Sequence, residues 1–295
     1  MIQFIKYRMW VAISSVIFIS IFLFSALYQY TQRGSVFLYS IDFTGGTQVL
    51  LKTPVQLKTD LLHAKLAEYG WHNADIRLFG TDECLIKVQD YSSDAKGLGE
   101  KIQQAVQQTI TEGTVELLQS EAVGPGIGES LRMKSLRAVI ISLIAMLLYI
   151  AFRFWSFAFA IGAVIALLHD AIAMLAMLYF FNKEISMNVI GAILAVLGYS
   201  INDTIVIFSR IRQDLARNSG KFLDEIVNES INRTLTRTLL TSFSTILPVI
   251  AMLLFGGDAL YNFSFVLIIG IVFGTYSSIY IASPIMMLFY KNDEK

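Results

Sequence analysis

An aspartate inside a long apolar run is the side chain in this sequence with the most chemistry to offer. Residues 187–208 are apolar enough to span a membrane, and the motif LGYSINDT at 197–204 places Asp203 inside that run. If the run is a helix, Asp203 lies roughly 10 Å below the first basic residue, Arg210, at ~1.5 Å per residue. An ionised carboxylate there costs about 2.5–3.5 kcal/mol, so intramembrane acids usually have a partner or a task, foremost proton or ion relay.

The alternative is a structural acid that pairs with Asn202, Thr204 or a neighbouring helix. A second polar stripe bears on this choice, because residues at i, i+4, i+7, i+8 and i+11 of another apolar run are Arg237, Thr241, Ser244, Thr245 and Pro248. The first run has its own stripe, formed by Tyr199, Asp203, Val206 and Arg210. If both stripes face inward, Arg237 comes near Asp203.

Two further apolar runs carry small residues at helical spacing, which favours close helix packing. The last run has Gly270, Gly274, Ser278 and Ala282, and an earlier run has Gly162, Ala166, Asp170 and Ala173. The pair His169 and Asp170 raises the question of a metal or phosphohydrolase site. No second cluster of ligands occurs in the apolar runs, so we interpret Asp170 as a polar residue that bridges helices.

The composition indicates a membrane protein, since 55% of residues are hydrophobic and 16% are charged. A net charge of zero gives no case for a nucleic-acid partner. Zinc spacings are absent from the sequence, and a single cysteine excludes a disulfide within the chain. That cysteine, Cys84, lies in an alternating, strand-like run, and we predict that it is a small core residue.

Hydropathy predicts six membrane spans, because each run reaches or approaches the ~20 residues that cross a bilayer. They are Met9–Tyr28, Leu136–Phe152, Trp155–Phe181, Met187–Phe208, Thr238–Phe255 and Tyr261–Phe289. The first follows Lys6 and Arg8 as a signal peptide would, but its core is long and no A-x-A site follows. We therefore predict an uncleaved anchor.

Basic residues between the spans predict the orientation, because short cytoplasmic loops are rich in Lys and Arg. They fall on one side, which is then the cytoplasm with both chain ends: Lys6, Arg8, Arg153, Arg210, Arg212, Arg217, Lys221, Arg233, Arg237, Lys291 and Lys295. The opposite side receives turns near 182–184 and 256–258 and one loop, about 31–133. That loop is so long that its charges do not indicate on which side of the membrane it lies.

The large loop has the pattern of a folded domain. Strand signals lie at 47–51, 74–79, 84–88 and 114–118, and a longer alternative for the last strand ends at 123. Helix signals lie at 59–69 and 93–110, with Thr59 as the N-cap of the first helix. The order βαββαβ is that of the ferredoxin-like split fold. We predict an α-helical integral membrane protein with six transmembrane helices (1–30 and 134–295) and a ferredoxin-like α+β extracytoplasmic domain (31–133) between helices 1 and 2.

Two glycine-rich segments flank this domain and are expected to join it to the membrane. They are IDFTGGT at 41–47, with Asp42, Gly45 and Gly46, and VGPGIG at 123–128, with Gly124 and Pro125. Paired glycines permit turns that are closed to other residues. A phosphate-binding loop is disfavoured, because no Gly-Lys-Ser/Thr follows.

Four ordered motifs resemble the SecF family, whose members belong to the RND transporter superfamily. They are IDFTGGT at 41–47, GYSINDT at 198–204, NRTLTRT at 232–238 and GTYSSIY at 274–280, and the resemblance covers nearly the whole chain. It implies a proton-driven accessory subunit of the Sec translocase, which pulls proteins late in export after a cytosolic ATPase has pushed them. Asp203 matches the proton-path aspartate of the family, and Arg237 matches its arginine partner.

The resemblance also implies the surroundings of the protein: the bacterial inner membrane, a SecD-like companion, the SecYEG translocon, YajC and YidC, and exported unfolded polypeptides. We expect Asp203 and Arg237 to have the polar support of Tyr199, Ser200, Asn202, Thr204, Asn232, Arg233, Thr241 and Asp170. Two positions depart from the family pattern. Ser40 stands where glycine is frequent, and Ser209 replaces an aspartate of many relatives at the cytoplasmic edge.

Three other functions fit parts of the sequence. A half-size RND exporter of small molecules fits less well, because such exporters usually have twelve spans and two large loops. An intramembrane aspartyl protease would use Asp170 and Asp203, but Asp203 follows Ser-Ile-Asn and lacks the Gly-x-Gly-Asp setting. A passive translocon assembly factor would need Asp203 only as a structural contact. We expect a transport subunit, neither an enzyme nor a protein with a cofactor or metal.

Overall fold

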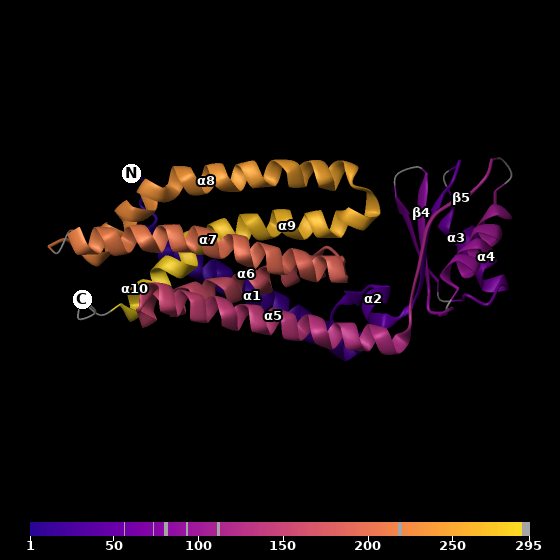
Figure 1. The fold of residues 1–295 in the computed structure, drawn as a ribbon, viewed down its shortest axis with the longest axis horizontal. Coiled ribbons are helices and arrows are strands. Elements are labelled where there is room, and N and C mark those ends of the chain that lie inside the picture. Colours follow the sequence, from indigo (N-terminus) through magenta and orange to yellow (C-terminus); the bar gives the residue numbers. More distant parts are fainter. Residues whose placement is uncertain are drawn as a thin grey trace. The chain divides into compact units, whose positions relative to one another are not determined.

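The computed structural model describes residues 1–55, 57–72, 74–79, 82–92, 94–110, 113–217 and 220–290. Its chain divides into two compact units. The helical unit contains Met1–Leu38 and Arg137–Lys295, and the α/β unit contains Tyr39–Leu136. Figure 1 labels their elements.

Long apolar helices build the helical unit. A short 3-10 turn, η1 (Ile5–Tyr7), precedes α1 (Arg8–Arg33), and the chain returns through α5 (Pro125–Phe154), α6 (Phe157–Phe180), α7 (Met187–Arg217), α8 (Leu223–Phe255), α9 (Gly257–Ser277), the π-helical η2 (Ser278–Ala282) and α10 (Ser283–Phe289). Within the described residues, six helical segments are long and apolar enough to cross a membrane, and the last is formed by α9, η2 and α10 together. The length and apolar composition of these helices confirm the six predicted spans.

Three helices extend well beyond the predicted spans. α5 begins at Pro125 rather than Leu136, α7 ends at Arg217 rather than near Phe208, and α8 begins at Leu223 rather than Thr238. The added turns carry charged residues, which a hydropathy window excludes. A helix can continue into water because its backbone hydrogen bonds are made within the segment.

The last predicted span is interrupted. Pro284 lacks a backbone N–H and would leave a helical carbonyl without its partner. The chain adjusts by a π-helical turn at Ser278–Ala282, where Ser283 Oγ donates a hydrogen bond to the Ser278 carbonyl at 3.1 Å. Single π turns of this kind often occur at functional positions in helices.

α6, α7 and α9 form the centre of the helical unit. In each of these helices about half of the apolar membrane-spanning stretch is buried: 56% for α6, 50% for α7 and 50% for the span 260–289 that includes α9. The corresponding shares are 17% for α1, 11% for α5 and 17% for α8. The buried face of α6 includes small residues: Gly162, Ala163, Ala166 and Ala173. Lipid is as apolar as leucine, so small and polar residues rather than hydrophobic ones decide which helix faces turn inward.

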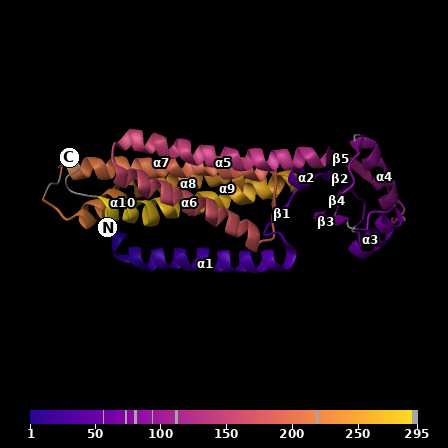
Figure 2. The ribbon, with the colours of Figure 1, turned by 90° about the horizontal axis from the view of Figure 1, so that it is seen from below.

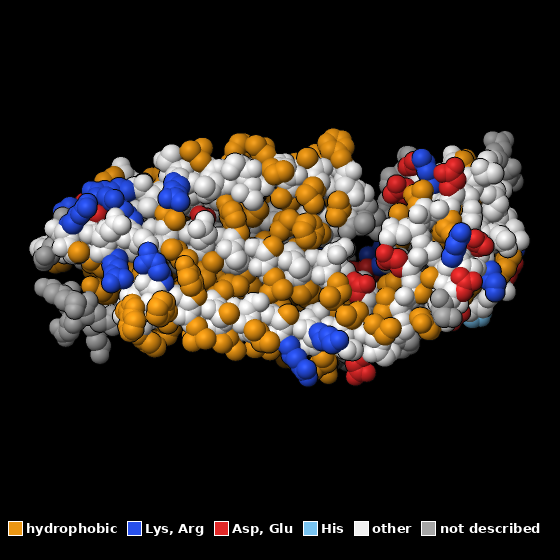
Figure 3. All heavy atoms as spheres, in the orientation of Figure 1, with side chains coloured by type: hydrophobic (Ala, Val, Ile, Leu, Met, Phe, Trp, Pro, Cys, Tyr) orange, Lys and Arg blue, Asp and Glu red, His pale blue; other side chains and the backbone are white. Residues whose placement is uncertain are grey.

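The ends of these helices gather in two groups. α1 begins and α10 ends where α7 gives way to α8, while the α6–α7 and α8–α9 turns lie at the opposite end of the unit (Figures 1 and 2). Lys and Arg side chains surround the end where α7 meets α8 (Figure 3). The last basic residues of the sequence, at 291–295, lie outside the described residues.

A four-stranded antiparallel sheet with two helices forms most of the α/β unit. In chain order its elements are α2 (Ile41–Thr44), β2 (Gly46–Lys52), α3 (Thr59–Glu68), β3 (Asp75–Phe79), β4 (Glu83–Val88), α4 (Ala95–Gln107) and β5 (Glu116–Val123). The sheet order is β3-β4-β2-β5. Val49 opposes Ile86 on β4 and Ser120 on β5, which fixes the register. Two short strands, β1 (Leu38–Tyr39) and β6 (Glu184–Ile185), complete the chain.

The sheet packs one face against α3 and α4. Alternation places Val49 and Leu51 with Cys84 and Ile86 on this face, and the helices contribute Leu62, Leu66, Ile102 and Val106. Cys84 is fully buried in this core, which confirms its predicted place. Burial raises the pKa of the Cys84 thiol to about 12, so the thiol stays protonated.

Helix boundaries in this unit differ from prediction in two places. Lys58, not Thr59, occupies the N-cap position of α3 and makes no side-chain cap. α4 is shorter than the predicted 93–110, because Asp94 caps it by accepting a hydrogen bond from the Gly97 N–H at 2.9 Å. Ser93, where the second helix was predicted to begin, and residues 80–81, between the predicted strands 74–79 and 84–88, lie outside the described residues.

The two glycine-rich segments pack against each other within the α/β unit. Gly45 and Gly46 have φ of 76° and 118°, and a Cβ on Gly46 would lie 2.5 Å from the Val88 carbonyl oxygen. Contrary to the prediction of a turn, Pro125 begins α5 and the following glycines are helical, as proline at a first helical position favours. A Cβ on Gly128 would lie 3.0 Å from the backbone of Phe43.

Candidate functional site

α7 carries the central polar residues on one buried face. Asp203 is 4% exposed, and Ser200 and Thr204 on the same face are 1% and 2% exposed. Asn202 points out of the unit and is exposed. The helical repeat explains the split, because residues three or four apart share a face and adjacent residues do not.

Asp203 lacks a hydrogen bond on one oxygen. Within the described part of the chain, its Oδ2 is buried without a hydrogen-bond partner, and the same holds for Thr238 Oγ1 on α8. Buried oxygens of this kind are rare in folded proteins and cost about 1–3 kcal/mol, more when charged. Binding of a proton, a water molecule or another polar group would therefore stabilise the Asp203 carboxyl.

Arg237 lies near Asp203 without forming an ion pair with it. Its charge acts on the Asp203 carboxyl, yet among the described residues no ion pair joins the two, and Arg237 is exposed at the surface of α8. The predicted stripe on α8 does not all face inward. Ser244 and Pro248 are exposed, while Thr241 and Thr245 are half-buried.

Hydroxyl groups connect α8 to the central helices. Thr245 Oγ1 donates to Tyr199 Oη at 3.4 Å, and the hydroxyls of Ser242 and Thr275 lie 2.7 Å apart. Thr241 donates to the Arg237 carbonyl at 3.0 Å, within its own helix. Tyr199 thus bridges α7 to α8, and Thr241 has a local role in this state.

Asp170 forms the centre of a second polar cluster. Its Oδ2 accepts hydrogen bonds from Ser200 Oγ at 2.6 Å and from Ser277 Oγ at 2.9 Å. His169 Nδ1 lies 3.3 Å from the other oxygen, Oδ1. Asp170 therefore joins α6 to both α7 and α9, as expected for a helix-bridging residue.

Small residues permit this close approach of α7 and α9. A Cβ on Gly274 would lie 2.9 Å from the Ser200 Cβ, and one on Gly270 would lie 2.5 Å from a methyl of Val196. Ser278 Oγ lies 3.0 Å from Thr204 Oγ1. Glycine at both positions is a steric requirement of this contact.

A third buried carboxylate, Asp214, was not predicted. It is 2% exposed near the end of α7. Arg210 Nε and Ser230 Oγ donate to its Oδ2 at 3.0 and 2.9 Å, and Arg233 Nη1 donates to its Oδ1 at 3.3 Å. The signal was present in the sequence, because Asp214 follows Asp203 by eleven residues, about three helical turns, and so shares its face.

Asn232 and Arg233 lie away from Asp203. Asn232 binds the N-terminal segment, donating to the Ile2 carbonyl at 2.8 Å and accepting from the Ile2 N–H at 2.9 Å. Arg233 belongs to the Asp214 cluster. The residues of the motif at 232–238 therefore act in three different places, and Arg237 is the one whose charge acts on Asp203.

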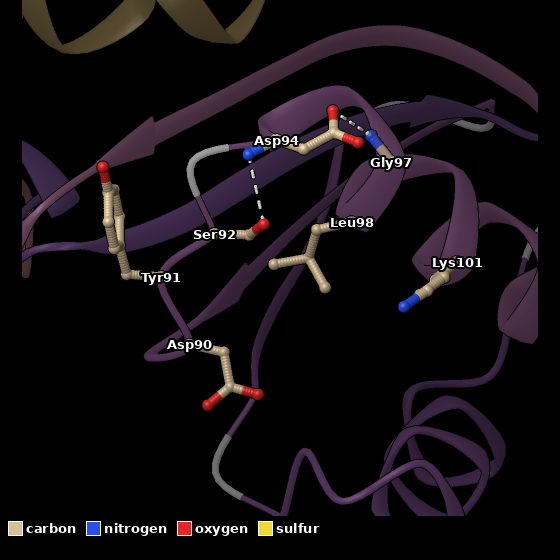
Figure 4. A pocket seen from close by; sticks show the side chains of 7 residues that line it. All are labelled: Asp90, Tyr91, Ser92, Asp94, Gly97, Leu98 and Lys101. Carbon is tan, nitrogen blue, oxygen red and sulfur yellow. Dashed lines mark hydrogen bonds between the residues drawn. The ribbon is translucent and has the colours of Figure 1, made fainter.

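A hollow of about 360 Å³ in the described part of the α/β unit is lined by Asp90, Tyr91, Ser92, Asp94, Gly97, Leu98 and Lys101 (Figure 4). Both of its acids already have structural roles. Asp90 Oδ2 accepts from Trp71 Nε1 at 2.9 Å, and Asp94 caps α4. Among the described residues, no three His, Cys, Asp or Glu side chains are grouped as metal ligands would be.

Fold and site define a class: a multi-pass helical membrane protein with buried titratable side chains at its centre. Comparison with known families agrees, because the family described as "Protein export membrane protein SecD/SecF, C-terminal" matches residues 101–292. The chain belongs to the SecD/SecF family.

Relatives within the family share most of this chain. It is 40% identical over 250 residues to the protein translocase subunit SecF of Pseudomonas aeruginosa, covering 84% of this chain and 80% of that protein. It is 36% identical over 267 residues to the protein translocase subunit SecDF of Thermus thermophilus, covering 88% of this chain and 35% of the longer protein.

A solved structure has the same fold. The crystal structure of SecDF, a translocon-associated membrane protein from Thermus thermophilus, matches with a TM-score of 0.84 at 34% identity. The match covers 97% of this chain, which spans 38% of the length of that protein.

Proposed function

We propose that this chain is an accessory subunit of the protein-export translocase and couples proton flow to late-stage export across the cytoplasmic membrane. The family membership and the translocase names of its relatives support the role in export. One observation carries the proton coupling: Asp203 is buried within an apolar span with an oxygen that lacks a hydrogen bond.

The physics of this coupling follows from the charge of Asp203. A proton that moves down the membrane potential releases about 2.3 kcal/mol per 100 mV. Proton binding removes the negative charge and with it the attraction between Asp203 and Arg237. Because α7 and α8 carry the two groups, their packing then has one preferred arrangement for each protonation state.

The proposal includes an orientation. Basic residues around the α7–α8 end support a cytoplasmic position for that end and for both termini, in the inner membrane of a bacterium. The α/β unit then lies outside the cytoplasm. We assign it a ferredoxin-like fold, supported by the order β3-β4-β2-β5 and its two helices. Domain limits of 1–30, 31–133 and 134–295 complete this proposal, with Asp42, Gly45, Gly46, Gly124 and Pro125 at the joints.

We infer that a SecD-like companion completes the proton path. In the SecDF relative, the region similar to this chain takes up 35% of the protein. The remainder of that longer protein would correspond to the companion subunit. Arg237 supports the inference, because a guanidinium exposed on a membrane span needs protein or water beside it. SecYEG and exported unfolded polypeptides are the further partners in this proposal.

The test replaces Asp203 with Asn, which keeps the shape of the side chain but cannot titrate. We expect Asp203→Asn to assemble with its companion and lose the stimulation of export by a proton gradient, measured in energised vesicles. Asp203→Glu, which still titrates, should keep part of it. Equal stimulation in the Asn variant and the wild type would refute proton coupling and favour passive assembly.

A further inference from the structure

Asp170 is a fully buried carboxylate that the proposed proton path does not use. It is 0% exposed, and so is Ser277, while Ser200 is 1% exposed. In the described part of the chain, no Lys or Arg forms an ion pair with Asp170. The polar groups that contact it among the described residues are the hydroxyls of Ser200 and Ser277 and the imidazole of His169.

This environment is suited to a carboxyl group that changes its protonation state. An ionised carboxylate accepts hydrogen bonds only, and both serine hydroxyls can donate to it. A neutral carboxyl carries a proton of its own, which it donates either from Oδ2 to one of the serines or from Oδ1 to His169 Nδ1. Among the described residues no Lys or Arg pairs with Asp170, so hydrogen bonds from the serines and the contact with His169 are what hold this carboxyl in its buried place.

Ser277 has an alternative acceptor within reach. Its Oγ lies 2.9 Å from Asp170 Oδ2 and 3.1 Å from the Gly274 carbonyl oxygen in its own helix. A hydroxyl has one proton, so it cannot make both bonds at full strength at once. Donation to Asp170 ties α9 to α6, and donation to Gly274 releases that tie.

The tie lies at the point where the last span can adjust. The π-helical turn η2 begins at Ser278, directly after Ser277. Ser278 Oγ lies 3.0 Å from Thr204 Oγ1, and Ser200 precedes Asp203 by three residues, about one turn. A change at Asp170 therefore reaches the Asp203-bearing turn of α7 through Ser200 and the π turn through Ser277.

We propose that Asp170 is a second proton-binding carboxylate of this protein, which positions the Asp203-bearing turn of α7 through Ser200 and controls the α6–α9 contact through Ser277. The proposal rests on the proposed proton-coupled function and adds a group on α6 to it. Among the described residues, His169 on α6 is a titratable group in contact with Asp170, and Asp203 on α7 lies three residues after Ser200, which binds Asp170. The His169 ring also packs against the Tyr276 ring, with centroids 5.9 Å apart.

The first test detects the proton directly. Infrared difference spectra of the complete chain, recorded against pH, should contain a protonated-carboxyl band that disappears in Asp170→Asn. Ser277→Ala should shift the frequency of this band, because it removes a hydrogen bond from the same oxygen. Ser264→Ala is the matched control, since Ser264 is a buried serine of α9 whose hydroxyl makes no hydrogen bond to the described residues. Identical bands in wild type and Asp170→Asn would overturn the proposal.

The second test separates this inference from the proposed function. The Asn amide oxygen still accepts from Ser200 and Ser277, so a purely structural Asp170 predicts that Asp170→Asn keeps proton-stimulated export. We expect Asp170→Asn to lose the stimulation of export by a proton gradient. We also expect the pH profile of this stimulation to shift in Ser277→Ala but not in Ser264→Ala. Wild-type stimulation in Asp170→Asn beside its loss in Asp203→Asn would overturn this inference alone. Wild-type stimulation in Asp203→Asn would overturn the proposed function instead.

Discussion

Three aspartates of the helical unit solve the problem of a buried carboxylate in three ways. Asp214 has two guanidinium groups and a serine hydroxyl, Asp170 has two hydroxyls and an imidazole, and Asp203 has one oxygen without a hydrogen bond. Each added donor stabilises the charged form and fixes the side chain. Asp203 has the fewest hydrogen-bond donors of the three, so binding a proton stabilises this carboxyl most. For this reason Asp203 carries the proposed function.

Arg237 provides the first prediction at this scale. Arg237→Ala removes the cation that acts on Asp203, and we expect proton-stimulated export to fall to the level of Asp203→Asn. Arg237→Lys should restore only part, since lysine keeps the charge but lacks the planar fork that binds a carboxylate with two hydrogen bonds. Arg212→Ala, which removes an exposed cation near the end of α7, is the control. Full activity in Arg237→Ala would make Arg237 an ordinary membrane-edge anchor.

At the scale of elements, polar contacts organise the helices more than hydrophobicity does. α6, α7 and α9 meet where Asp170, Ser200 and Ser277 are hydrogen-bonded, and α7 meets α8 at Asp214. In lipid an apolar face gains little from burial, so hydrogen bonds and close backbone contact select the partner. The strength of these contacts can be measured one helix pair at a time.

The α7–α8 contact at Asp214 should contribute measurably to stability. Removing Asp214 leaves Arg210, Arg233 and Ser230 without their shared acceptor, and hydrogen bonds to charged groups are worth about 1.5–3 kcal/mol. We expect Asp214→Ala to lower the thermal midpoint of the purified protein in detergent. Asp224→Ala is the comparison, because its ion pair with Arg8 is exposed and worth about 0–1 kcal/mol. Equal midpoints in both variants would contradict the prediction.

The α7–α9 contact should be intolerant of a methyl group. Gly274→Ala places a Cβ 2.9 Å from that of Ser200, and overpacking of this kind costs about 1–3 kcal/mol. Gly191→Ala in α7 meets no atom within 4 Å and should be neutral. Thermal midpoints and yields of folded protein would report the difference. If Gly274→Ala matched Gly191→Ala, the small-residue face would not determine packing.

At the scale of the whole molecule, the membrane-spanning helices determine on which side of the membrane each loop lies. The described residues contain six helical segments that can each cross the membrane, and the 39–136 unit follows the first of them in the chain. We propose the direction of crossing from the charge distribution, because loops rich in Lys and Arg usually stay in the cytoplasm. This orientation assigns opposite sides to Asp82 and Lys221.

Cysteine labelling tests that orientation. A membrane-impermeant maleimide should label Asp82→Cys from outside intact inner membranes and should label Lys221→Cys only after the membrane is opened. Native Cys84 should stay silent in both cases, since it is buried and its raised pKa of about 12 leaves almost no thiolate at neutral pH. The wild-type chain is therefore the background control. External labelling at Lys221 but not at Asp82 would reverse the proposed topology.

The sequence by itself determined the features that depend on local pattern. Six apolar runs predicted six spans, alternation predicted the strands around Cys84, and an acid within an apolar run identified Asp203. These features follow from hydropathy and side-chain period, which act over a few turns of helix or residues of strand. Four ordered motifs likewise identified the family, which the comparisons confirmed.

Only the tertiary structure decided how these parts meet. Asp214 and Ser277 entered the polar clusters, Arg237 proved to be exposed, and the glycine-rich segment at 124–128 became the start of a helix. The physical reason is that a helix face has no inside or outside until neighbouring helices cover it. In a membrane, where both faces are apolar, hydrogen bonds between residues far apart in the sequence decide which face is buried.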